Sequence, residues 1–220
     1  MFGYTFYWSL VWDAIPELLA GAWLTVQLAA LSMLLGTLLG LPLAVARRHG
    51  EGRAYRLATT WVELARNTPT VFQIYMMYFG LGSLGIQISS YWAVLIALTF
   101  NNAGYLAEIF RGGLGAIARQ QMAAARSLGL TPQQSYLHVV FPQLFRVVFP
   151  GYVTQAVWAM LNTSLGMLVG LHELSGAAQS AQSVSFRSFE FFLITALIYY
   201  VIAKLIEFGA RVVFWRWLRT

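Results

Sequence analysis

The sequence predicts an all-α protein integral to a membrane, on three observations. Hydrophobic residues make up 59% of the 220 residues and charged residues only 10%, whereas a soluble domain carries about 25% charged residues. Mean hydropathy is +0.63. Long stretches carry no charge, and the basic residues gather in short segments between them. So few charges cannot cover a water-facing surface, and we expect one transmembrane domain over residues 1–220.

Five spanning helices are expected from the charge-free stretches, because a span needs about 20 mostly apolar residues. The stretch 67–107 is too long for one span and is interrupted at LGSLGIQISS (81–90). The second span must then begin near Leu57, and Pro69 is expected to kink it. The predicted spans are about 18–44, 57–79, 89–112, 145–170 and 190–212.

The basic residues predict the orientation of these spans. Eleven of the 14 Lys and Arg lie between spans one and two, between spans three and four, or at the end of span five, and the opposite loops hold only Arg187. The positive-inside rule places the N-terminus outside and the C-terminus in the cytoplasm. The net charge of +6 therefore reflects topology, and we expect no nucleic-acid partner. The first basic residue is Arg47, so a cleaved signal peptide is not expected.

The longest predicted cytoplasmic loop, about 113–144, contains a short polar helix-turn-helix. Residues 118–128 are good helix formers, and Gly129 suits the left-handed position that ends a helix. Thr131 fits an N-cap, with Pro132 at the first helical position and Gln134 completing a capping box. We expect the second helix to end near Phe141, where Pro142 breaks it.

Two interpretations of this loop remain open. It fits an amphipathic loop resting on lipid headgroups. It also fits a docking element, because the small Ala123, Ala124 and Ala125 allow a partner backbone to approach, and Arg119 and Arg126 share one helical face.

Several segments resemble a known family. Residues 121–130, QMAAARSLGL, followed by Phe141-Pro142-Gln143, resemble the EAA loop of ABC importer permeases. Three segments are similar to the polar amino acid uptake branch: WVELARNTPTVFQIYMMYFGL (61–81), NNAGYLAEIFRGGLGAIARQQ (101–121) and NTSLGMLVGLHEL (162–174). A weaker similarity at GAWLTVQLAALS (21–32) extends the resemblance over nearly the whole chain.

The resemblance implies a type I importer permease fold in a bacterial inner (plasma) membrane, crossed several times. It implies an ATP-driven amino acid importer that works by alternating access. Its partners would be an ATPase dimer carrying ATP and Mg²⁺, a second permease chain, a periplasmic or extracellular substrate-binding protein, and membrane lipid. The loop 113–144 would be the coupling loop, with ATPase contacts at Arg119, Gln120, Gln121, Met122, Ala123, Ala124, Ala125, Arg126, Leu128 and Gly129.

The chain itself is expected to be no enzyme and to hold no cofactor or metal. Its only lysine, Lys204, follows Ala203, so the phosphate-binding motif G-x-x-x-x-G-K-[ST] is absent. There is no cysteine, no His cluster with metal spacing and no paired carboxylate suited to acid–base catalysis.

Two positions depart from the family pattern. Ala123 stands where the family has the glutamate of its EAA motif, and Leu161-Asn162 replaces the usual Lys-Asp. Permeases of this branch often form heterodimers, and we hypothesise that this chain is the partner with the weaker motif. Because Asn162 stands in place of Asp, we do not expect this chain to bind the cationic side chain of a substrate.

Polar residues form one helical stripe in each of spans three and four. Asn101 and Tyr105 share a stripe with Glu108, and Gln155, Trp158 and Asn162 form the other. Such residues line a path for a zwitterion, or serve as interhelical packing and hydrogen bonding. The predicted substrate path comprises Asn101, Tyr105, Gln155, Trp158, Asn162, Thr163 and Ser164.

Two ion pairs are predicted at a spacing of three residues. Glu63 with Arg66 and Glu108 with Arg111 are interpreted as local structural pairs. His172 and Glu173, just beyond span four, are expected in a solvated outer loop.

Two rivals to a permease remain. A non-transporting membrane scaffold would use the central loop to recruit a cytosolic partner and would need no polar stripes. A secondary transporter or membrane enzyme would need acids or a catalytic group in mid-membrane, whereas the eight acids lie mostly near span ends or in loops.

Overall fold

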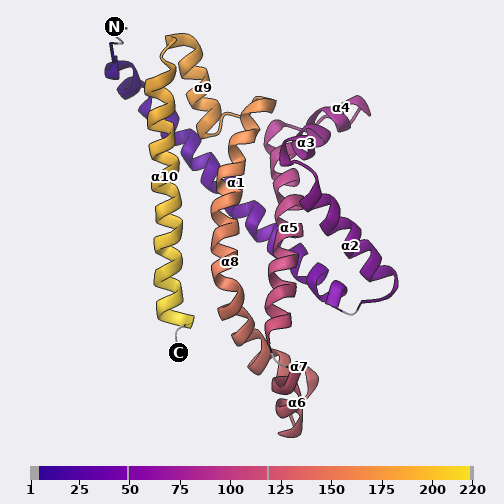
Figure 1. The fold of residues 1–220 in the computed structure, drawn as a ribbon. Helices are drawn as coiled ribbons and strands as arrows, with labels where there is room; N and C mark the ends of the chain where they lie inside the picture. The colour runs from indigo at the N-terminus through magenta and orange to yellow at the C-terminus, as the bar shows by residue number, and fades with distance from the viewer. Residues whose placement is uncertain (1–4, 49, 118, 219–220) are drawn as a thin grey trace.

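The chain folds entirely into helices over the residues that the computed structural model describes, which are 5–48, 50–117 and 119–218 without the side chains of Arg119, Trp217 and Leu218 (Figure 1). The all-α prediction is confirmed. The elements are α1 (Trp8–Arg48), α2 (Gly52–Asn67), α3 (Thr70–Tyr75), η1 (Met76–Gly80), α4 (Leu81–Ser83), α5 (Ser90–Ala116), α6 (Arg119–Ser127), α7 (Pro132–Ser135), η2 (Tyr136–Val140), α8 (Phe141–Asn162), η3 (Thr163–Val169), α9 (Leu174–Ser185), α10 (Ser188–Val213) and η4 (Phe214–Leu218).

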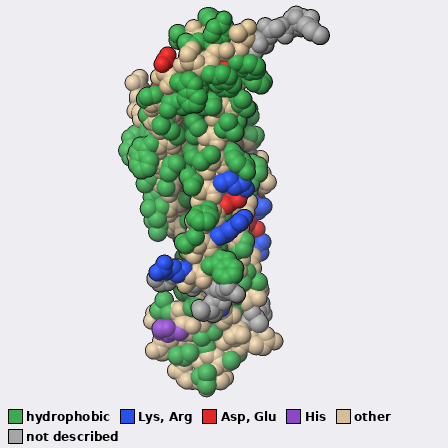
Figure 2. Space-filling model, turned by 90° about the vertical axis from the view of Figure 1, so that its left-hand side faces the viewer, with side chains coloured by type: hydrophobic (Ala, Val, Ile, Leu, Met, Phe, Trp, Pro, Cys, Tyr) green, Lys and Arg blue, Asp and Glu red, His purple; other side chains and the backbone are tan. Residues whose placement is uncertain are grey.

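Four helical stretches among the described residues are long and apolar enough to cross a membrane. They are 8–48, 90–116, 132–169 and 188–216, which correspond to predicted spans one, three, four and five. α1 begins near α9 at one end of the molecule, and α10 ends toward the other end, where α6 and α7 lie (Figure 1). On the face shown in Figure 2 hydrophobic side chains dominate, and most charged side chains lie at or below mid-height.

The second predicted span is not one continuous helix. α2 ends at Asn67, Thr68 is extended with φ −118° and ψ 140°, and α3 begins after Pro69. A proline disfavours the helical conformation of the residue before it, so Pro69 ends α2 instead of kinking a longer helix. The pieces α2, α3, η1 and α4 follow one another from the α1–α2 loop toward the upper end of the molecule (Figure 1).

Pro142 does not break its helix, contrary to the sequence prediction. The turn before it is a π-helix, in which the Phe141 N–H donates to the Tyr136 carbonyl, five residues back. This wider turn admits a proline at the start of α8, where an N–H is not required. The stretch from Pro132 to Val169 is therefore continuously helical.

α1 lies obliquely across the other helices (Figure 1). Its 41 residues span about 62 Å, twice the roughly 30 Å of a bilayer core, so it must tilt. It meets α5 at Gly36 and Gly40. A Cβ at Gly36 would lie 2.8 Å from the Asn102 Cβ, and one at Gly40 would lie 3.0 Å from the Ala103 oxygen. Only glycine permits this approach, as in G-x-x-x-G contacts between membrane helices.

α5 is the centre of the bundle and uses glycines against two further helices. A Cβ at Gly104 would lie 2.5 Å from the Ala65 Cβ of α2. A Cβ at Gly113 would lie 2.3 Å from Val148 Cγ1 of α8. α1, α2 and α8 therefore all pack closely against α5.

Glu173 is buried, not in a solvated loop. It is 0% exposed and caps α9, accepting hydrogen bonds from the Ser175 N–H (3.0 Å) and the Gly176 N–H (2.9 Å). Thr25 Oγ1 of α1 and the Tyr199 hydroxyl of α10 also donate to it, at 3.2 and 2.8 Å. Burial raises the pKa of this carboxyl, although these hydrogen bonds act in the opposite direction. His172, beside it, is exposed as expected.

Glu108 pairs with three arginines from three helices. Arg111 of α5 contacts it at 2.8 Å, as predicted, Arg66 of α2 lies 3.5 Å away, and Arg47 of α1 completes the cluster. The predicted Glu63–Arg66 pair is wrong, because the Arg66 guanidinium turns toward α5 and lies 5.5 Å from the centre of the Tyr105 ring. We call Glu108 with Arg47, Arg66 and Arg111 the Glu108 cluster.

Replacing Gly36 with valine should destabilise the protein by about 1–3 kcal/mol, because the new side chain overlaps Asn102. The midpoint temperature of thermal unfolding in detergent should fall by several degrees, because each kcal/mol lowers it by about 2–4 °C for a chain of this size. Gly209→Val is the control, because a Cβ there meets nothing within 4 Å. Equal stability of the two variants would contradict the close packing.

Replacing Glu108 with glutamine should lower stability by about 2 kcal/mol or more, because three arginines would lose their shared counter-charge. The matched control is Glu63→Gln, which should be nearly neutral. The midpoint temperature of thermal unfolding in detergent checks the stability of both variants. A larger loss for Glu63→Gln would restore the local pair that the sequence suggested.

Candidate functional site

Polar residues of α5 and α8 meet in a cavity of about 570 Å³, which we call the α5–α8 cavity. Five of the seven residues predicted for the substrate path line it. Thr70 of α3, Ile109 of α5, and Gly151 and Thr154 of α8 complete the lining. The predicted path residues at the cavity are Asn101, Tyr105, Gln155, Trp158 and Asn162.

Thr163 and Ser164 lie outside this cavity. Thr163 is fully buried and its hydroxyl donates to the Met160 carbonyl at 2.7 Å. Ser164 lines a separate cavity of about 590 Å³ next to α10. Thr163 and Ser164 directly follow Asn162, so both in a regular helix and in the 3-10 helix that begins at Thr163 their side chains point away from the stripe formed by Gln155, Trp158 and Asn162.

Asn101 and Gln155 are nine-tenths buried and hydrogen-bonded within the protein. Asn101 Nδ2 donates to the Ala65 carbonyl at 3.0 Å and to Gln73 Oε1 at 3.2 Å. Gln155 Nε2 donates to Asn102 Oδ1 at 2.8 Å. The structural role weighed for these amides is therefore real, since they join α5 to α2, α3 and α8.

The side-chain oxygens of three amides that line the cavity accept no hydrogen bond among the described residues. Asn162 Nδ2 donates to the Trp158 carbonyl at 3.0 Å, so it too uses its nitrogen within the protein. The oxygens of Asn101, Gln155 and Asn162 are left as acceptors at the cavity that these residues line. Each amide can thus join helices through its nitrogen and offer its oxygen to a bound group.

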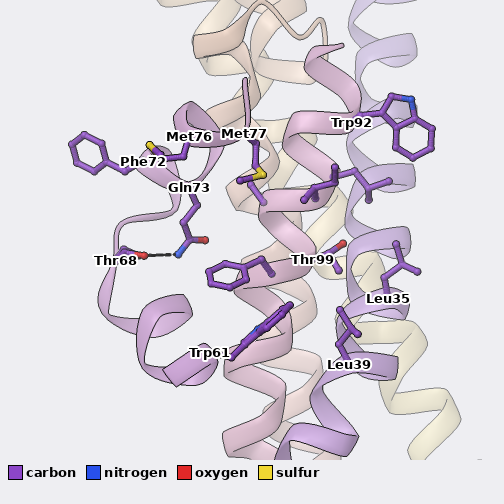
Figure 3. A pocket seen from close by; sticks show the side chains of 14 residues that line it. Leu35, Leu39, Trp61, Thr68, Phe72, Gln73, Met76, Met77, Trp92 and Thr99 are labelled. Carbon is purple, nitrogen blue, oxygen red and sulfur yellow. Dashed lines mark hydrogen bonds between the residues drawn. The ribbon is translucent and has the colours of Figure 1, made fainter. Parts of the chain in front are cut away.

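Two buried amides were missed by the sequence interpretation. Asn102 Nδ2 donates to Ser32 Oγ of α1 at 3.1 Å and its oxygen accepts from Gln155, which forms a chain across three helices. Gln73 Nε2 donates across the break at Thr68, to the Thr68 hydroxyl at 2.9 Å (Figure 3). Both lie in the charge-free stretch 67–107, where an isolated amide is itself a signal of a polar contact.

The Glu108 cluster lies one turn of α5 from Tyr105, beside the α5–α8 cavity. Arg66 joins the two, because its guanidinium lies over the Tyr105 ring and reaches Glu108. The cluster holds three positive charges and one negative charge, and Arg66 and Arg111 keep side-chain exposures of 40% and 46%. The local field is therefore positive at this end of the cavity.

The predicted coupling residues form α6 and the turn after it, at the extreme end of the molecule (Figure 1). Ala125 is buried at 3% exposure, and Met122 packs against the core that contains Leu144 of α8. Leu128 is 83% exposed at the tip. The remaining exposed members are Gln120, Gln121, Ala123, Ala124, Arg126 and Gly129; the Arg119 side chain lies outside the described residues.

The turn after α6 has the geometry that the sequence predicted. Gly129 has φ +84°, its N–H donates to the Arg126 carbonyl, and the Leu130 N–H donates to the Ala125 carbonyl. These two bonds are a Schellman motif. The Thr131 capping box is present, with both reciprocal bonds at 2.8 and 3.2 Å. Arg126 Nη1 donates to the Leu130 carbonyl, so this arginine also braces the turn.

No metal site is evident in the part of the chain that the structure describes, since no three His, Asp or Glu residues there gather into a group.

The chain matches known proteins along nearly its full length. The family model described as "binding-protein-dependent transport system inner membrane component" matches residues 13–218. The L-cystine transport system permease protein TcyL of Bacillus subtilis is 30% identical over 211 residues, covering 93% of this chain and 88% of the relative. The glutamine transport system permease protein GlnP of Escherichia coli is 30% identical over 208 residues, covering 94% and 95%.

Solved structures agree with these matches. A crystal structure of an amino acid ABC transporter with histidines superposes with a TM-score of 0.87 at 28% identity, covering 95% of this chain and 98% of that one. The MetNI methionine ABC transporter shares the fold at a TM-score of 0.75 and 21% identity, covering 90% of this chain and 95% of that one. The family model, the relatives and the multi-pass helical fold together show that the chain belongs to the binding-protein-dependent transport system inner membrane components, the permeases of ABC transporters.

Proposed function

We propose that this chain is the permease subunit of an ATP-driven amino acid importer of a bacterial inner membrane, and that the α5–α8 cavity is part of its substrate path. The convergence of polar residues from two helices in one cavity carries the proposal. Relatives that transport cystine, arginine and glutamine support an amino acid as the substrate.

The chemistry of the cavity suits a neutral or zwitterionic amino acid. The oxygens of Asn101, Gln155 and Asn162 offer acceptors for an ammonium group, and no described carboxylate is among the residues that line the cavity. The positive Glu108 cluster beyond Tyr105 favours the carboxylate end. Because Asn162 replaces the family's usual aspartate, a cationic side chain would lack a counter-charge in this subunit.

Coupling to ATP hydrolysis would run through α6. By family, two ATPase chains carrying ATP and Mg²⁺ dock at the coupling loops, and a second permease chain completes the path. The exposed Leu128 and the small Ala123 and Ala124 suit a docking surface, even without the family glutamate. A substrate-binding protein would deliver the amino acid at the opposite end.

The helix that follows the coupling loop supports alternating access. From Pro132 to Gln155 it runs about 35 Å without interruption, so a displacement of the loop moves the cavity-lining residues of α8. Met122 packs on the same core as Leu144 and Val148, which fixes α6 to this helix. ATP-driven closure of the ATPase pair would rock α8 against α5 and open the cavity to alternate sides.

Replacing Gln155 or Asn162 with leucine should lower uptake at least tenfold, because each change removes an acceptor from the cavity and leaves a bound polar group unpaired. Uptake is measured with radiolabelled amino acids in vesicles containing the whole transporter. Ser164→Ala is the control, because Ser164 lies outside this cavity. Normal uptake by both leucine variants would support a non-transporting scaffold instead.

Replacing Gly129 with proline should release the ATPase, because proline cannot adopt φ +84° and has no N–H to donate to Arg126. The tagged chain, co-expressed with neighbouring gene products, is purified from detergent and its partners are identified. Gly50→Pro, also at a positive φ but in the α1–α2 loop, is the control and should keep the ATPase. Absence of an ATPase from the wild-type sample would contradict the proposed coupling.

A further inference from the structure

The amide of Asn101 is held by a chain of hydrogen bonds that begins at the break between α2 and α3. In a regular helix the Ala65 carbonyl would accept from the N–H of residue 69, but Pro69 has no N–H. Two side chains take its place, because Gln73 Nε2 and Asn101 Nδ2 each donate to the Ala65 oxygen at 3.0 Å. The carbonyl that Pro69 leaves free thus becomes a fixed acceptor for two amides.

The partners of Gln73 leave its amide only one orientation. A backbone carbonyl oxygen accepts hydrogen bonds and cannot donate them, so an amide must turn its NH₂ group toward it. Gln73 Nε2 donates to the carbonyls of Ala65 and Thr68, at 3.0 and 3.2 Å, and to the Thr68 hydroxyl (Figure 3). Gln73 Oε1 is therefore turned toward Asn101, whose Nδ2 donates to it at 3.2 Å. Asn101 commits its NH₂ group to these two acceptors, and its oxygen accepts no hydrogen bond among the described residues.

A second chain of hydrogen bonds fixes Gln155, and it begins at a carbonyl of α1. Ser32 Oγ donates to the Ala29 carbonyl at 3.1 Å, so its oxygen is left to accept from Asn102 Nδ2, also at 3.1 Å. Asn102 Oδ1 is then turned toward Gln155 and accepts from its Nε2 at 2.8 Å. The Gln155 oxygen is thereby left in the same state as that of Asn101, as a free acceptor.

Gln73 and Asn102 lie outside the α5–α8 cavity. Asn102 is 2% exposed, and Gln73 lines a separate apolar pocket of about 510 Å³ between α1, α2–α3 and α5 (Figure 3). Neither is among the described residues that line the cavity, whereas Asn101 and Gln155 are. Any effect of Gln73 or Asn102 on a bound substrate must therefore act through these two amides.

We propose that Gln73 and Asn102 are positioning residues that make the α5–α8 cavity selective for the ammonium end of its substrate. This inference rests on the proposed function. An amide that is free to turn presents either its oxygen or its NH₂ group to a bound molecule. The two chains of hydrogen bonds remove that choice, because each one starts from a carbonyl that only accepts. Two acceptors held in place bind an ammonium, which only donates, and reject a group without N–H bonds.

The orientation of the amides is tested first, without any substrate. Gln155→Glu places a carboxylate against Asn102 Oδ1, so that two acceptors face each other. Asn102→Asp buries the same charge, but both of its neighbours can donate, because Gln155 Nε2 already does and the Ser32 hydroxyl can turn. At about pH 8, where carboxylates are ordinarily ionised, the midpoint of thermal unfolding should fall by several degrees more for Gln155→Glu than for Asn102→Asp.

Selectivity for the ammonium is tested on the purified complex of permeases and ATPase, without its binding protein. Binding of each proteinogenic amino acid is measured, and the tightest binder is compared with the same acid lacking its α-ammonium group. For L-glutamine this analogue is glutaramate. The wild type should prefer the amino acid by at least about tenfold, because the analogue leaves two acceptors without a charged donor.

The positioning residues should control this preference. Gln73→Leu and Asn102→Leu should each reduce it at least about threefold, because Asn101 or Gln155 is then free to turn. Asn102→Asp keeps an acceptor for Gln155 Nε2 and should retain the preference. A loss of stability alone would weaken binding of the amino acid and its analogue equally, and would leave their ratio unchanged.

Two further variants serve as controls. Once Asn101→Leu has removed the amide, adding Gln73→Leu should not change the preference further, because Gln73 acts only through Asn101. Gln182→Leu removes an amide whose Nε2 donates to Ser188 Oγ at 2.9 Å, between α9 and α10 and away from the cavity lining. This variant should keep the wild-type preference.

Three results would overturn the proposal. Equal destabilisation by Gln155→Glu and Asn102→Asp would mean that the amides are not held in one orientation. An unchanged preference in both Gln73→Leu and Asn102→Leu would leave these residues with a structural role only, while the proposed transport would stand. A wild-type complex that binds no amino acid would contradict the proposed function, and this inference with it.

Discussion

The close approach of helix backbones at α5 is the constraint on which the rest of the structure depends. In a bilayer, lipid is as apolar as leucine, so helices associate through tight packing and hydrogen bonds rather than through burial of apolar surface. α5 meets its neighbours at small residues, and Asn101 and Asn102 bond across the same contacts. These contacts decide the rotation of each helix, and therefore which side chains reach the cavity.

The cavity depends on the same amides that hold the helices together. Asn101 and Gln155 give their N–H groups to the protein and keep their oxygens for the cavity. The structural and the functional interpretations of an intramembrane amide are therefore compatible, since its two ends have different chemistry. A consequence is that movement of α8 relative to α5 changes the hydrogen bonding inside the cavity as well as its shape.

α2 is joined to α5 by close packing and polar contacts and does not stand as an independent span. Ala65 packs on Gly104 and accepts a hydrogen bond from Asn101, and Arg66 reaches Glu108. The break at Thr68 and Pro69 frees the chain to turn into α3 beyond these contacts.

The sequence by itself determined the features that depend on neighbouring residues. Charge-free lengths indicated four of the five predicted spans, and Gly129 and Thr131 specified the coupling turn. Helical periodicity placed Asn101 and Tyr105 on one stripe, and Gln155, Trp158 and Asn162 on another. Only the tertiary structure decided which groups from distant segments pair. Arg66 pairs with Glu108 and not with Glu63. Glu173 is a buried cap that accepts hydrogen bonds from Thr25 and Tyr199. A π-turn keeps Pro142 within a helix. Local patterns fix local geometry, whereas partners across helices depend on depth and crossing angle, which no short stretch of sequence encodes.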